Sequence, residues 1–383
     1  MAASSNIDAE TRPQPSPRLW GALGLMSGTS LDGIDVAMIE TDGDERVIPG
    51  PALTIAYKDA FRERLRSVLG GIGPVSEVEG KLTRLHADAV EQFVARHPGT
   101  RIDIVGLHGH TILHRPAERR TWQLGDGALL AQLLARDVVA DFRSADIAAG
   151  GQGAPLAPLF HAALAATLPK PVAVLNIGGV ANVTWIGEGT EILAFDTGPG
   201  NALIDDWVRH HTGAVADIDG AVARAGRASA VHIARFLAAP FLERRPPKSL
   251  DRDDFREIVP DGLSVEDGAA TLTEMTAAAA AAAIQYFPSP ARKWLVCGGG
   301  RRNPVLMDAL ARRVGGVVFP VEAVGWDGDA LEAQAFAYLA VRSVRGLPLS
   351  LPSTTGVSRP VSGGRLFTAA RQPSNWIAST VSQ

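Results

Sequence analysis

The chain has 383 residues, of which 46% are hydrophobic, and its formal net charge at pH 7 is −4. That length allows two domains of ordinary size, and the apolar fraction is typical of a globular protein with a large buried core. The small negative charge, without a basic stripe, argues against nucleic acid as a partner. Cys297 is the single cysteine, which excludes an internal disulfide and predicts a cytoplasmic protein.

The first eighteen residues are rich in Ser, Pro and Ala and lack the apolar segment of a secretory signal. We therefore expect residues 1–18 to form a disordered tail. No uninterrupted apolar run approaches the length of a transmembrane helix, and so we expect no membrane partner.

Short apolar runs alternate with helical patterns along the chain, which predicts an α/β fold. The predicted strands are 23–26, 34–39, 102–107, 171–177, 191–195 and 293–297. The predicted helices are 75–96, 127–135, 156–167, 272–286 and 330–345. Polar or glycine-rich segments follow five of the strands. Because ligands of open α/β sheets bind beyond the carboxyl ends of strands, we expect these segments to form one cleft between two domains.

The segment from Met26 to Asp35 combines two glycines, three hydroxyls and two carboxylates. Glycines allow close approach to a ligand, hydroxyls and backbone N–H groups bind phosphate oxygens, and carboxylates can hold magnesium. A Walker A loop is excluded, because no lysine follows Gly33 and the next residues form a predicted strand. The alternative is a plain hairpin turn. The residues predicted to bind ATP here are Ser27, Gly28, Thr29, Ser30, Leu31, Asp32, Gly33 and Asp35.

Two further glycine-containing segments follow predicted strands, one from Asp196 to Asn201 and one from Gly298 to Gly300. Asp196 can act as a general base toward a water or a sugar hydroxyl, or it can cap the helix that follows. The three consecutive glycines leave room for a planar adenine and ribose, or they form only a flexible turn. The remaining predicted nucleotide contacts are Gly178, Gly179, Gly198, Gly200, Gly298, Gly299, Gly300 and Asn303.

Histidines 108, 110 and 114 lie on one extended segment. No cysteine lies nearby, and we predict no metal site formed by these side chains. His108 is a candidate substrate contact or a structural residue. Arg143 offers a planar fork that suits a carboxylate or phosphate, or it forms a salt bridge with Asp141 or Asp146.

Together these motifs resemble the anhydro-N-acetylmuramic acid kinase family, within the sugar-kinase/hsp70/actin superfamily. The resemblance runs from about residue 23 to residues 352–356, and several matching segments are long and contiguous. Two positions depart from the family pattern: His110 stands where Gln is usual, and Leu250-Asp251 stand where Thr-Gly is common. The matching segments are 24–33, 125–127, 139–143, 148–156, 175–179, 195–196, 198–201 and 295–300.

The resemblance implies two actin-like, ribonuclease-H-like domains with a central ATP cleft. We predict domain I at 19–139 plus 346–383 and domain II at 140–345. ATP and Mg²⁺ are the implied cosubstrate and ion, and a homodimer is the usual assembly.

The implied reaction belongs to cell-wall recycling. Water opens the 1,6-anhydro bridge of 1,6-anhydro-N-acetylmuramic acid, and O6 takes the γ-phosphate to give N-acetylmuramic acid 6-phosphate. By the matching motif Asp196 is the base, and Glu332 helps to place Mg²⁺ or O6. The predicted substrate contacts are His108, Thr111, Arg143, Gln152 and Asn176. The alternatives are another sugar or amino-sugar kinase, or a non-catalytic actin-like ATP-binding module.

Overall fold

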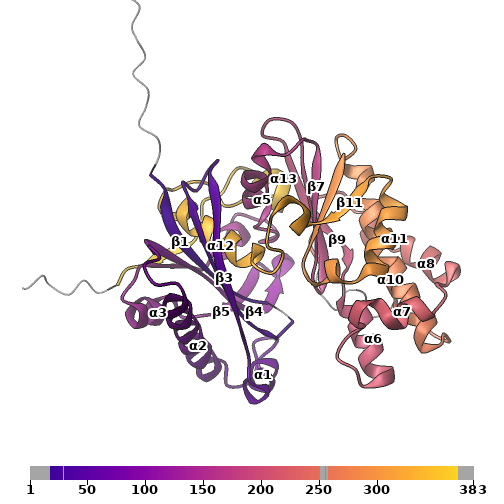
Figure 1. The fold of residues 1–383 in the computed structure, drawn as a ribbon, viewed down its shortest axis with the longest axis horizontal. Coiled ribbons are helices and arrows are strands. Elements are labelled where there is room, and N and C mark those ends of the chain that lie inside the picture. The colour runs from indigo at the N-terminus through magenta and orange to yellow at the C-terminus, as the bar shows by residue number, and fades with distance from the viewer. Residues whose placement is uncertain (1–17, 29, 251–254, 256–257, 370–383) are drawn as a thin grey trace, which may run out of the picture.

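The computed structural model describes residues 18–28, 30–250, 255 and 258–369, which form two halves built on separate β-sheets (Figure 1). Most of the predicted tail, residues 1–17, lies outside the described residues, whereas Arg18 pairs with Asp103 at 3.0 Å. None of the described helices is both long and apolar enough to cross a membrane.

The first sheet has the strand order β12-β6-β4-β1-β2-β3, with β5 paired to β4. Its strands are β1 (Trp20–Ser27), β2 (Gly33–Thr41), β3 (Val47–Ala56), β4 (Ile104–Arg115), β5 (Arg120–Leu124), β6 (Val138–Ala140) and β12 (Arg365–Phe367). The second sheet has the order β11-β10-β7-β8-β9. Its strands are β7 (Val172–Ile177), β8 (Val180–Ile186), β9 (Ile192–Pro199), β10 (Lys293–Cys297) and β11 (Val317–Pro320).

The two sheets share one connectivity. In each, the first three strands run antiparallel to their neighbours as a meander, and two later strands add in parallel beside the first. This repeated order confirms the predicted pair of ribonuclease-H-like units. As a result the β1–β2 and β7–β8 turns occupy equivalent places in the two halves.

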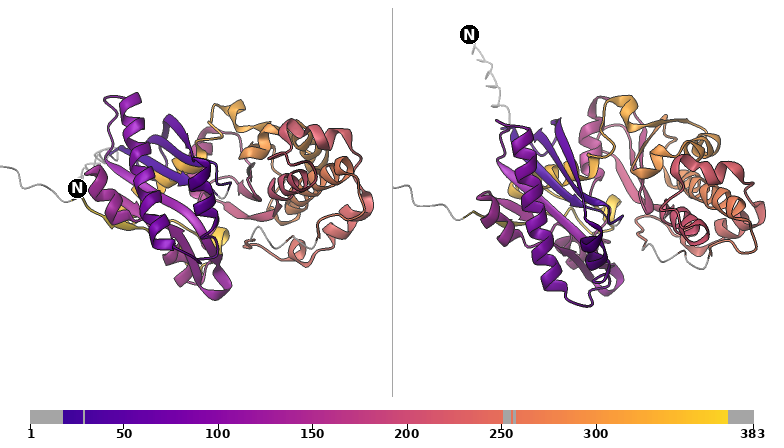
Figure 2. Two further views of the ribbon diagram at one scale, coloured as in Figure 1. Left: turned by 90° about the horizontal axis from the view of Figure 1, so that it is seen from below. Right: turned by 60° about the horizontal axis from the view of Figure 1, so that its bottom comes forward.

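Helices cover both faces of each sheet, as the views in Figures 1 and 2 show. One apolar cluster packs α2 against the first sheet, and another packs α10 and α11 against the second. A third cluster lies between the sheets and includes α5 and α12. The helices are α1 (Asp59–Arg66), α2 (Val75–Arg96), α3 (Gly127–Leu134), α4 (Ser144–Ala148), α5 (Pro158–Leu164), α6 (Ala202–Thr212), α7 (Ala221–Ala225), α8 (Ala230–Leu237), α9 (Pro240–Glu243), α10 (Val265–Ala282), α11 (Pro304–Val314), α12 (Leu331–Val344) and α13 (Pro352–Thr355).

All five predicted helices and all six predicted strands are present, but two of the polar motifs do not follow strand ends as expected. The His108–Thr111 segment lies inside β4, because β5 pairs with the strand from His110 onward, beyond its contact with β1. Asp196 likewise lies inside β9, where it pairs with Asn182 of β8. The prediction that all five motifs are loops was therefore wrong for these two.

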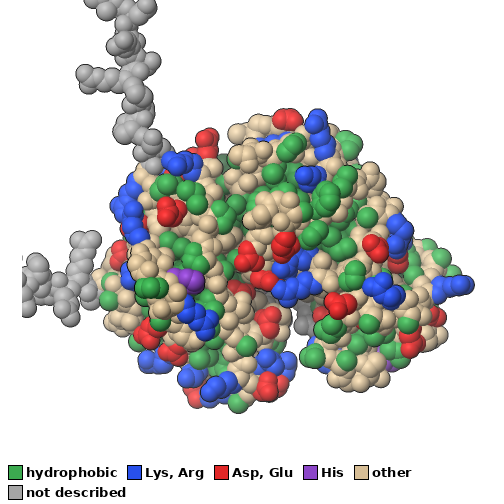
Figure 3. Space-filling model, in the orientation of Figure 1, with side chains coloured by type: hydrophobic (Ala, Val, Ile, Leu, Met, Phe, Trp, Pro, Cys, Tyr) green, Lys and Arg blue, Asp and Glu red, His purple; other side chains and the backbone are tan. Residues whose placement is uncertain are grey.

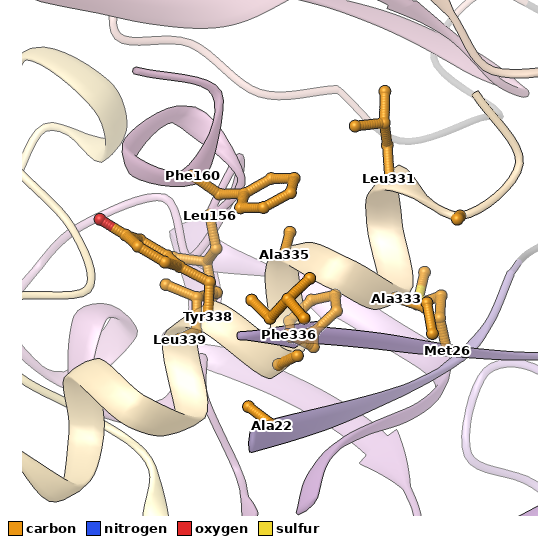
Figure 4. Packing of buried hydrophobic residues seen from close by; sticks show 14 of the residues in the cluster. Ala22, Met26, Leu156, Phe160, Leu331, Ala333, Ala335, Phe336, Tyr338 and Leu339 are labelled. Atoms are coloured by element: carbon orange, nitrogen blue, oxygen red, sulfur yellow. The ribbon is translucent and has the colours of Figure 1, made fainter. Parts of the chain in front are cut away.

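Helix α12 approaches the first sheet at backbone distance. A Cβ atom on Gly24 of β1 would lie 1.7 Å from the carbonyl oxygen of Ala333, and one on Gly106 of β4 would lie 2.2 Å from that of Phe336. Figure 4 shows α12 with its buried side chains between β1 residues Ala22 and Met26 and the α5 residue Phe160. Glycine is required at both sheet positions because the helix backbone occupies the space of a side chain.

The packing of α12 bears on the division into domains. This helix follows β11 in the chain, yet it contacts β1, β2 and β4, and the later β12 pairs with β6. In Figure 2 the yellow C-terminal segment accordingly lies with the indigo and purple first half. The division stays a proposal, and these contacts favour a return to domain I at Leu331 instead of residue 346.

Replacing Gly106 by Ala should lower the free energy of unfolding by about 1–3 kcal/mol, because the added methyl group overpacks the α12 contact. Gly80→Ala in α2 is the matched control. A Cβ atom there would meet nothing within 4 Å, and alanine should raise stability by up to about 1 kcal/mol through helix propensity. Urea unfolding of both variants checks this, and equal shifts would contradict the close approach.

Candidate active site

A buried cluster of hydrogen bonds supports the β1–β2 turn on its interior side. The Ser27 hydroxyl lies 2.6 Å from the Tyr57 hydroxyl and 3.0 Å from His110 Nδ1, and Ser27 is 1% exposed. The Tyr57 N–H donates to Asp32 O at 2.9 Å, and Arg62 Nε donates to Leu31 O at 2.9 Å. These bonds fix the shape of the turn, so Ser27 and Leu31 support it from inside.

The residues left at the surface of this turn are Gly28, Ser30 and Asp32. Ser30 Oγ donates to Asp32 Oδ1 at 2.7 Å. Gly33 is buried, because a Cβ atom there would lie 2.4 Å from Ile55 O of β3. Thr29 lies outside the described residues. Some of the predicted phosphate contacts in this turn are thus accessible at the surface, and others are buried beneath it.

The β7–β8 turn, Gly178-Gly179, is the equivalent feature of the second half. The N–H groups of Gly200 and Asn201 donate to the carbonyls of Gly179 and Gly178 at 3.0 and 2.7 Å. Gly178 itself has open space, since a Cβ atom there would lie 3.6 Å from its nearest neighbour. Gly198 is buried against Ala279 of α10. Gly198 and Gly200 therefore serve close packing, and Gly178 offers the accessible backbone.

The Gly298–Gly300 segment directly follows β10 and makes close backbone and side-chain contacts. Gly298 has a φ of +72°, and a Cβ atom there would lie 2.4 Å from Asn176 Oδ1. Arg301 donates to Gly298 O at 3.0 Å and pairs with Glu322 and Asp329 at 2.7 and 3.0 Å. Gly299 is exposed at the middle of the segment. A Cβ atom on Gly299 would lie 3.4 Å from Asn201 Nδ2, so the exposed backbone there borders a polar side chain.

Asn303 has a role that the prediction did not assign. Its side-chain oxygen accepts from the N–H groups of Val305 and Leu306 and so caps α11. The residue is 8% exposed. We therefore assign helix capping as the main role of Asn303.

Asp196 is a buried carboxylate, 7% exposed, on β9. The Leu250 N–H donates to Asp196 Oδ2 at 2.8 Å. Desolvation raises the pKa of Asp196 to about 7, against the lowering effects of this N–H, Arg143 and Lys248. The alternative role as a helix cap is wrong, since α6 begins after Asn201 without a side-chain cap. A carboxylate with this pKa suits general-base chemistry near neutral pH.

A group of carboxylates spans the space between the β1–β2 turn and the start of α12. Desolvation raises the pKa of Asp35 to about 6, with added effects from Asp32, Glu332 and Asp329. Glu332 is exposed at the molecular surface, but the protein around its carboxyl group still displaces part of its water. This desolvation raises the pKa of Glu332, and the charge of Asp32 adds to that rise. Asn176 Nδ2 of β7 donates to Glu332 Oε1 at 3.1 Å. Such a concentration of negative charge favours a bound cation.

His108 and Arg143 form a pair on the floor of the same region. His108 Nδ1 lies 3.0 Å from Gly109 O, and Arg143 approaches His108 Nε2 at 3.2 Å through Nε and at 2.9 Å through a terminal nitrogen. Both side chains rest on Phe336 of α12, with the His108 ring centroid 4.3 Å away. Desolvation and the charge of Arg143 hold the pKa of His108 well below its usual range. His108 is therefore a neutral acceptor that orients the guanidinium.

Arg143 also donates to Gly153 O at 2.7 Å, and none of the salt bridges among the described residues joins it to Asp141 or Asp146. Desolvation lowers the pKa of Arg143 to about 10, while the charges of Glu332, Asp196 and Asp146 act in the opposite direction. The guanidinium thus interacts electrostatically with both predicted catalytic carboxylates.

The other predicted substrate residues differ in position. Gln152 Oε1 accepts from Ser249 Oγ at 2.8 Å, which links it to the segment that binds Asp196. Thr111 lies on β4 beyond His108 and accepts from Gln123 of β5 at 3.2 Å. Within the described part of the chain, no three His, Cys, Asp or Glu side chains are placed to hold a metal ion.

Figure 3 shows acidic and basic side chains side by side over the middle of this face, between the two halves. Separate surface hollows beside Trp122 and beside Trp207 share none of the residues predicted for the site. The candidate site is therefore defined by the residues named above and not by either hollow.

Sequence reasoning missed several supporting residues, namely Tyr57, Arg62, Lys248 and Arg301. Arg301 directly follows the glycine triplet, which was a usable signal. Nothing in the sequence links Lys248 to the carbonyls that it contacts.

A family model described as "Anhydro-N-acetylmuramic acid kinase" matches residues 21–369. The anhydro-N-acetylmuramic acid kinase of Paramagnetospirillum magneticum is 57% identical over 349 residues, covering 90% of this chain and 98% of that protein. That of Rhodospirillum rubrum is 54% identical over 355 residues, covering 91% and 94%. A ROK family glucokinase from Streptomyces griseus, solved with glucose and AMPPNP, has a TM-score of 0.40 at 14% identity, covering 84% of this chain and 99% of that one. Because this TM-score is below 0.5, the fold is assigned from the two sheets described above and not from this similarity.

We expect the pKa of the His108 imidazole to lie well below the ordinary 6.5, because the ring is buried beside a cationic guanidinium, so the ring stays neutral at neutral pH. Histidine-selective NMR titration measures this, and His108→Gln identifies the signal by its loss. A midpoint near the ordinary value of 6.5 would contradict the described burial of His108 beside Arg143.

Proposed function

The chain belongs to the anhydro-N-acetylmuramic acid kinase family, and we propose that it uses ATP and water to convert 1,6-anhydro-N-acetylmuramic acid to N-acetylmuramic acid 6-phosphate. The observation that carries the proposal is the position of Asp196. This buried carboxylate, with a pKa of about 7, interacts electrostatically with Arg143, which also interacts with Glu332. A base, a guanidinium and an acidic group thus occupy one region bordered by two glycine-containing turns.

The reaction can be written from these groups. Asp196 takes a proton from water as the water oxygen attacks C1 of the sugar, and the C1–O6 bond breaks. The electron pair of that bond goes to O6, which attacks the γ-phosphorus of ATP while the bond to the β-phosphate oxygen breaks. The products are the 6-phosphate and ADP, and the proton on Asp196 passes to solvent. The strained bicyclic substrate allows the two steps to be linked in one site.

Backbone groups carry most of the proposed ATP binding. Gly28 and Ser30 on one side and Gly178 on the other present accessible turn backbone at equivalent places in the two sheets. Such turns bind phosphate oxygens through N–H groups. The Gly298–Gly300 segment would lie against the nucleoside. Its contacts with Arg301 place it beside Asp329, three residues before Glu332 of α12.

The residues near the β1–β2 turn fit a magnesium ion. Asp32 and Glu332 both raise the pKa of Asp35, and a bound cation would relieve that repulsion. Mg²⁺ commonly uses one or two carboxylates together with substrate phosphates and waters, so a complete protein ligand set is not needed. When bound, the ion would neutralise charge on the phosphates.

Arg143 is proposed to bind the anionic part of the sugar. N-Acetylmuramic acid derivatives carry a lactyl carboxylate, and a guanidinium presents two parallel donors to such a group. His108, Asn176, Gln152 and Thr111 remain proposed polar contacts to the sugar. A homodimer and a cytoplasmic location, implied by the family resemblance, also remain predictions.

The decisive experiment combines the purified chain, ATP and 1,6-anhydro-N-acetylmuramic acid in ¹⁸O-labelled water. We expect ADP and a 6-phosphate with the label at C1, measured by mass spectrometry before the anomeric hydroxyl exchanges with solvent.

Asp196→Asn should lose about 10²- to 10⁴-fold in turnover, as expected for a lost general base, with an unchanged melting temperature. The wild-type rate should fall as the pH drops below about 7 because Asp196 becomes protonated. Label-free product, or near-wild-type turnover by Asp196→Asn, would contradict the mechanism.

Gly28→Val should weaken ATP binding by at least about tenfold, or about 1.4 kcal/mol, through steric block. The fold should tolerate the change, because a Cβ atom at Gly28 would meet only Ser30 Oγ, at 3.3 Å. Calorimetric titration with ATP measures the effect, with Gly80→Ala as the remote control. Unchanged affinity would mean that the turn is structural and does not contact the nucleotide.

A further inference from the structure

Lys248 is a buried lysine that the mechanism above does not use. It is 2% exposed, and its Nζ donates to the carbonyls of Phe241 and Leu242 at 3.0 and 3.3 Å. These carbonyls lie in α9, a four-residue helix. An ammonium group is costly to bury unless hydrogen bonds replace its water, so both contacts are needed to keep Lys248 in place.

Aromatic rings enclose the same ammonium. Nζ lies 4.4 Å from the ring centroid of Phe241, 5.0 Å from that of Tyr286 and 5.8 Å from that of Phe195. The Tyr286 hydroxyl donates to Leu242 O at 2.8 Å, the carbonyl that Lys248 also contacts. Cation–π attraction of this kind strengthens when the cation is desolvated.

This aromatic enclosure is directly connected to the proposed base. Phe195 precedes Asp196 on β9, so the two side chains point to opposite faces of the sheet. The Lys248 ammonium therefore lies on the Phe195 side of the strand, and Asp196 lies on the opposite side.

The main chain makes a second connection. The Asp196 N–H donates to Lys248 O at 3.0 Å, and the Leu250 N–H donates to Asp196 Oδ2 at 2.8 Å. Between them, Ser249 Oγ donates to Gln152 Oε1 at 2.8 Å. We call residues 248–250 the base-holding segment, since each of its residues bonds to a residue of the proposed site.

We propose that Lys248 is a positioning residue: its anchored ammonium keeps the base-holding segment against β9, and the segment keeps the Asp196 carboxylate in its observed orientation. This inference rests on the proposed function of Asp196. Lys248 touches neither substrate nor ATP in this assignment and acts through the Leu250 N–H.

The charges around the pair give the expected direction of a pH effect. Arg143 and Lys248 favour the ionised form of Asp196, and Arg244 faces Lys248 from the end of α9. Removing the ammonium should raise the pKa of Asp196, both through the lost charge and through a loosened Leu250 hydrogen bond.

The test compares Lys248→Met and Lys248→Arg with the wild type. Lys293→Met is the matched control, because Lys293 also lies over an aromatic ring, that of Phe319 at 5.7 Å, at the opposite end of β10 from the glycines. Each protein is assayed for ATP affinity, for kcat and KM against pH, and for hydrogen exchange of the Leu250 amide.

For Lys248→Met we expect unchanged ATP affinity, a kcat lower by about 10- to 100-fold, and an acidic limb displaced to higher pH. The Leu250 amide should exchange at least about tenfold faster than in wild type, a free-energy change of about 1.4 kcal/mol. Lys248→Arg should recover part of kcat and of the limb position, because the charge and donors remain. Lys293→Met should match wild type in every measurement.

Wild-type kcat, limb and Leu250 exchange in Lys248→Met would overturn the proposal. A loss of kcat without a displaced limb or faster exchange would also overturn it, since the base would then be undisturbed. If the wild type itself does not phosphorylate the anhydro sugar, the proposed function fails, and the NMR-measured pKa of Asp196 with the Leu250 exchange rates still decides whether Lys248 positions the carboxylate.

Discussion

The contact between helix α12 and the glycines of β1 and β4 is the constraint on which the site depends. At Gly24 and Gly106 the helix backbone takes the place of side chains, so α12 can lie at only one depth on the sheet. Its first turn then delivers Glu332 to the region beside Asn176, and Phe336 supports both His108 and Arg143. A helix that begins after the second sheet and packs on the first thus joins the two halves at the site.

Buried charge is managed at this site by pairing across distant segments. Asp196, Arg143 and Lys248 are all desolvated, and desolvation displaces the pKa of each toward its neutral form. Each keeps partners that favour the charged form: an N–H for the carboxylate, backbone carbonyls for the two cations. The result is a carboxylate that can accept a proton near neutrality beside cations that stay protonated.

Much of the fold followed from local sequence. Helix α2 has the predicted bounds, because its apolar spacing is regular and Pro74 and His97 flank it. Local sequence also placed turns after β1, β7 and β10, since glycines there are local signals, and the role of Asp196 stays a proposal. Helix 272–286 was found from its alanines, but its true start at Val265 depends on the Ser264 cap.

What failed depended on contacts distant in sequence. The role of Ser27 as an ATP contact stays a prediction, but local sequence did not show that its hydroxyl faces Tyr57 and His110, which are 30 and 83 residues away. The His108 motif resembled a loop because the pairing of β4 with β5 beyond it was not evident from the sequence. Strand β5 has the alternating polar sequence of a half-exposed edge strand. No sequence pattern indicated a role for Lys248, because the carbonyls and aromatic rings that surround its ammonium come together only in the folded chain.

Cys297 ends β10 just before the glycines, and burial raises the pKa of its thiol far above the usual range. A thiol held in this protonated state reacts slowly with maleimides and oxidants. Since it is also the chain's single cysteine, the native protein is a nearly silent background for thiol-directed probes. A cysteine placed on the surface of each half would carry a spin label or dye without first removing a native residue. The separation of the two sheets, with and without nucleotide, thereby becomes directly measurable in the unaltered active-site sequence.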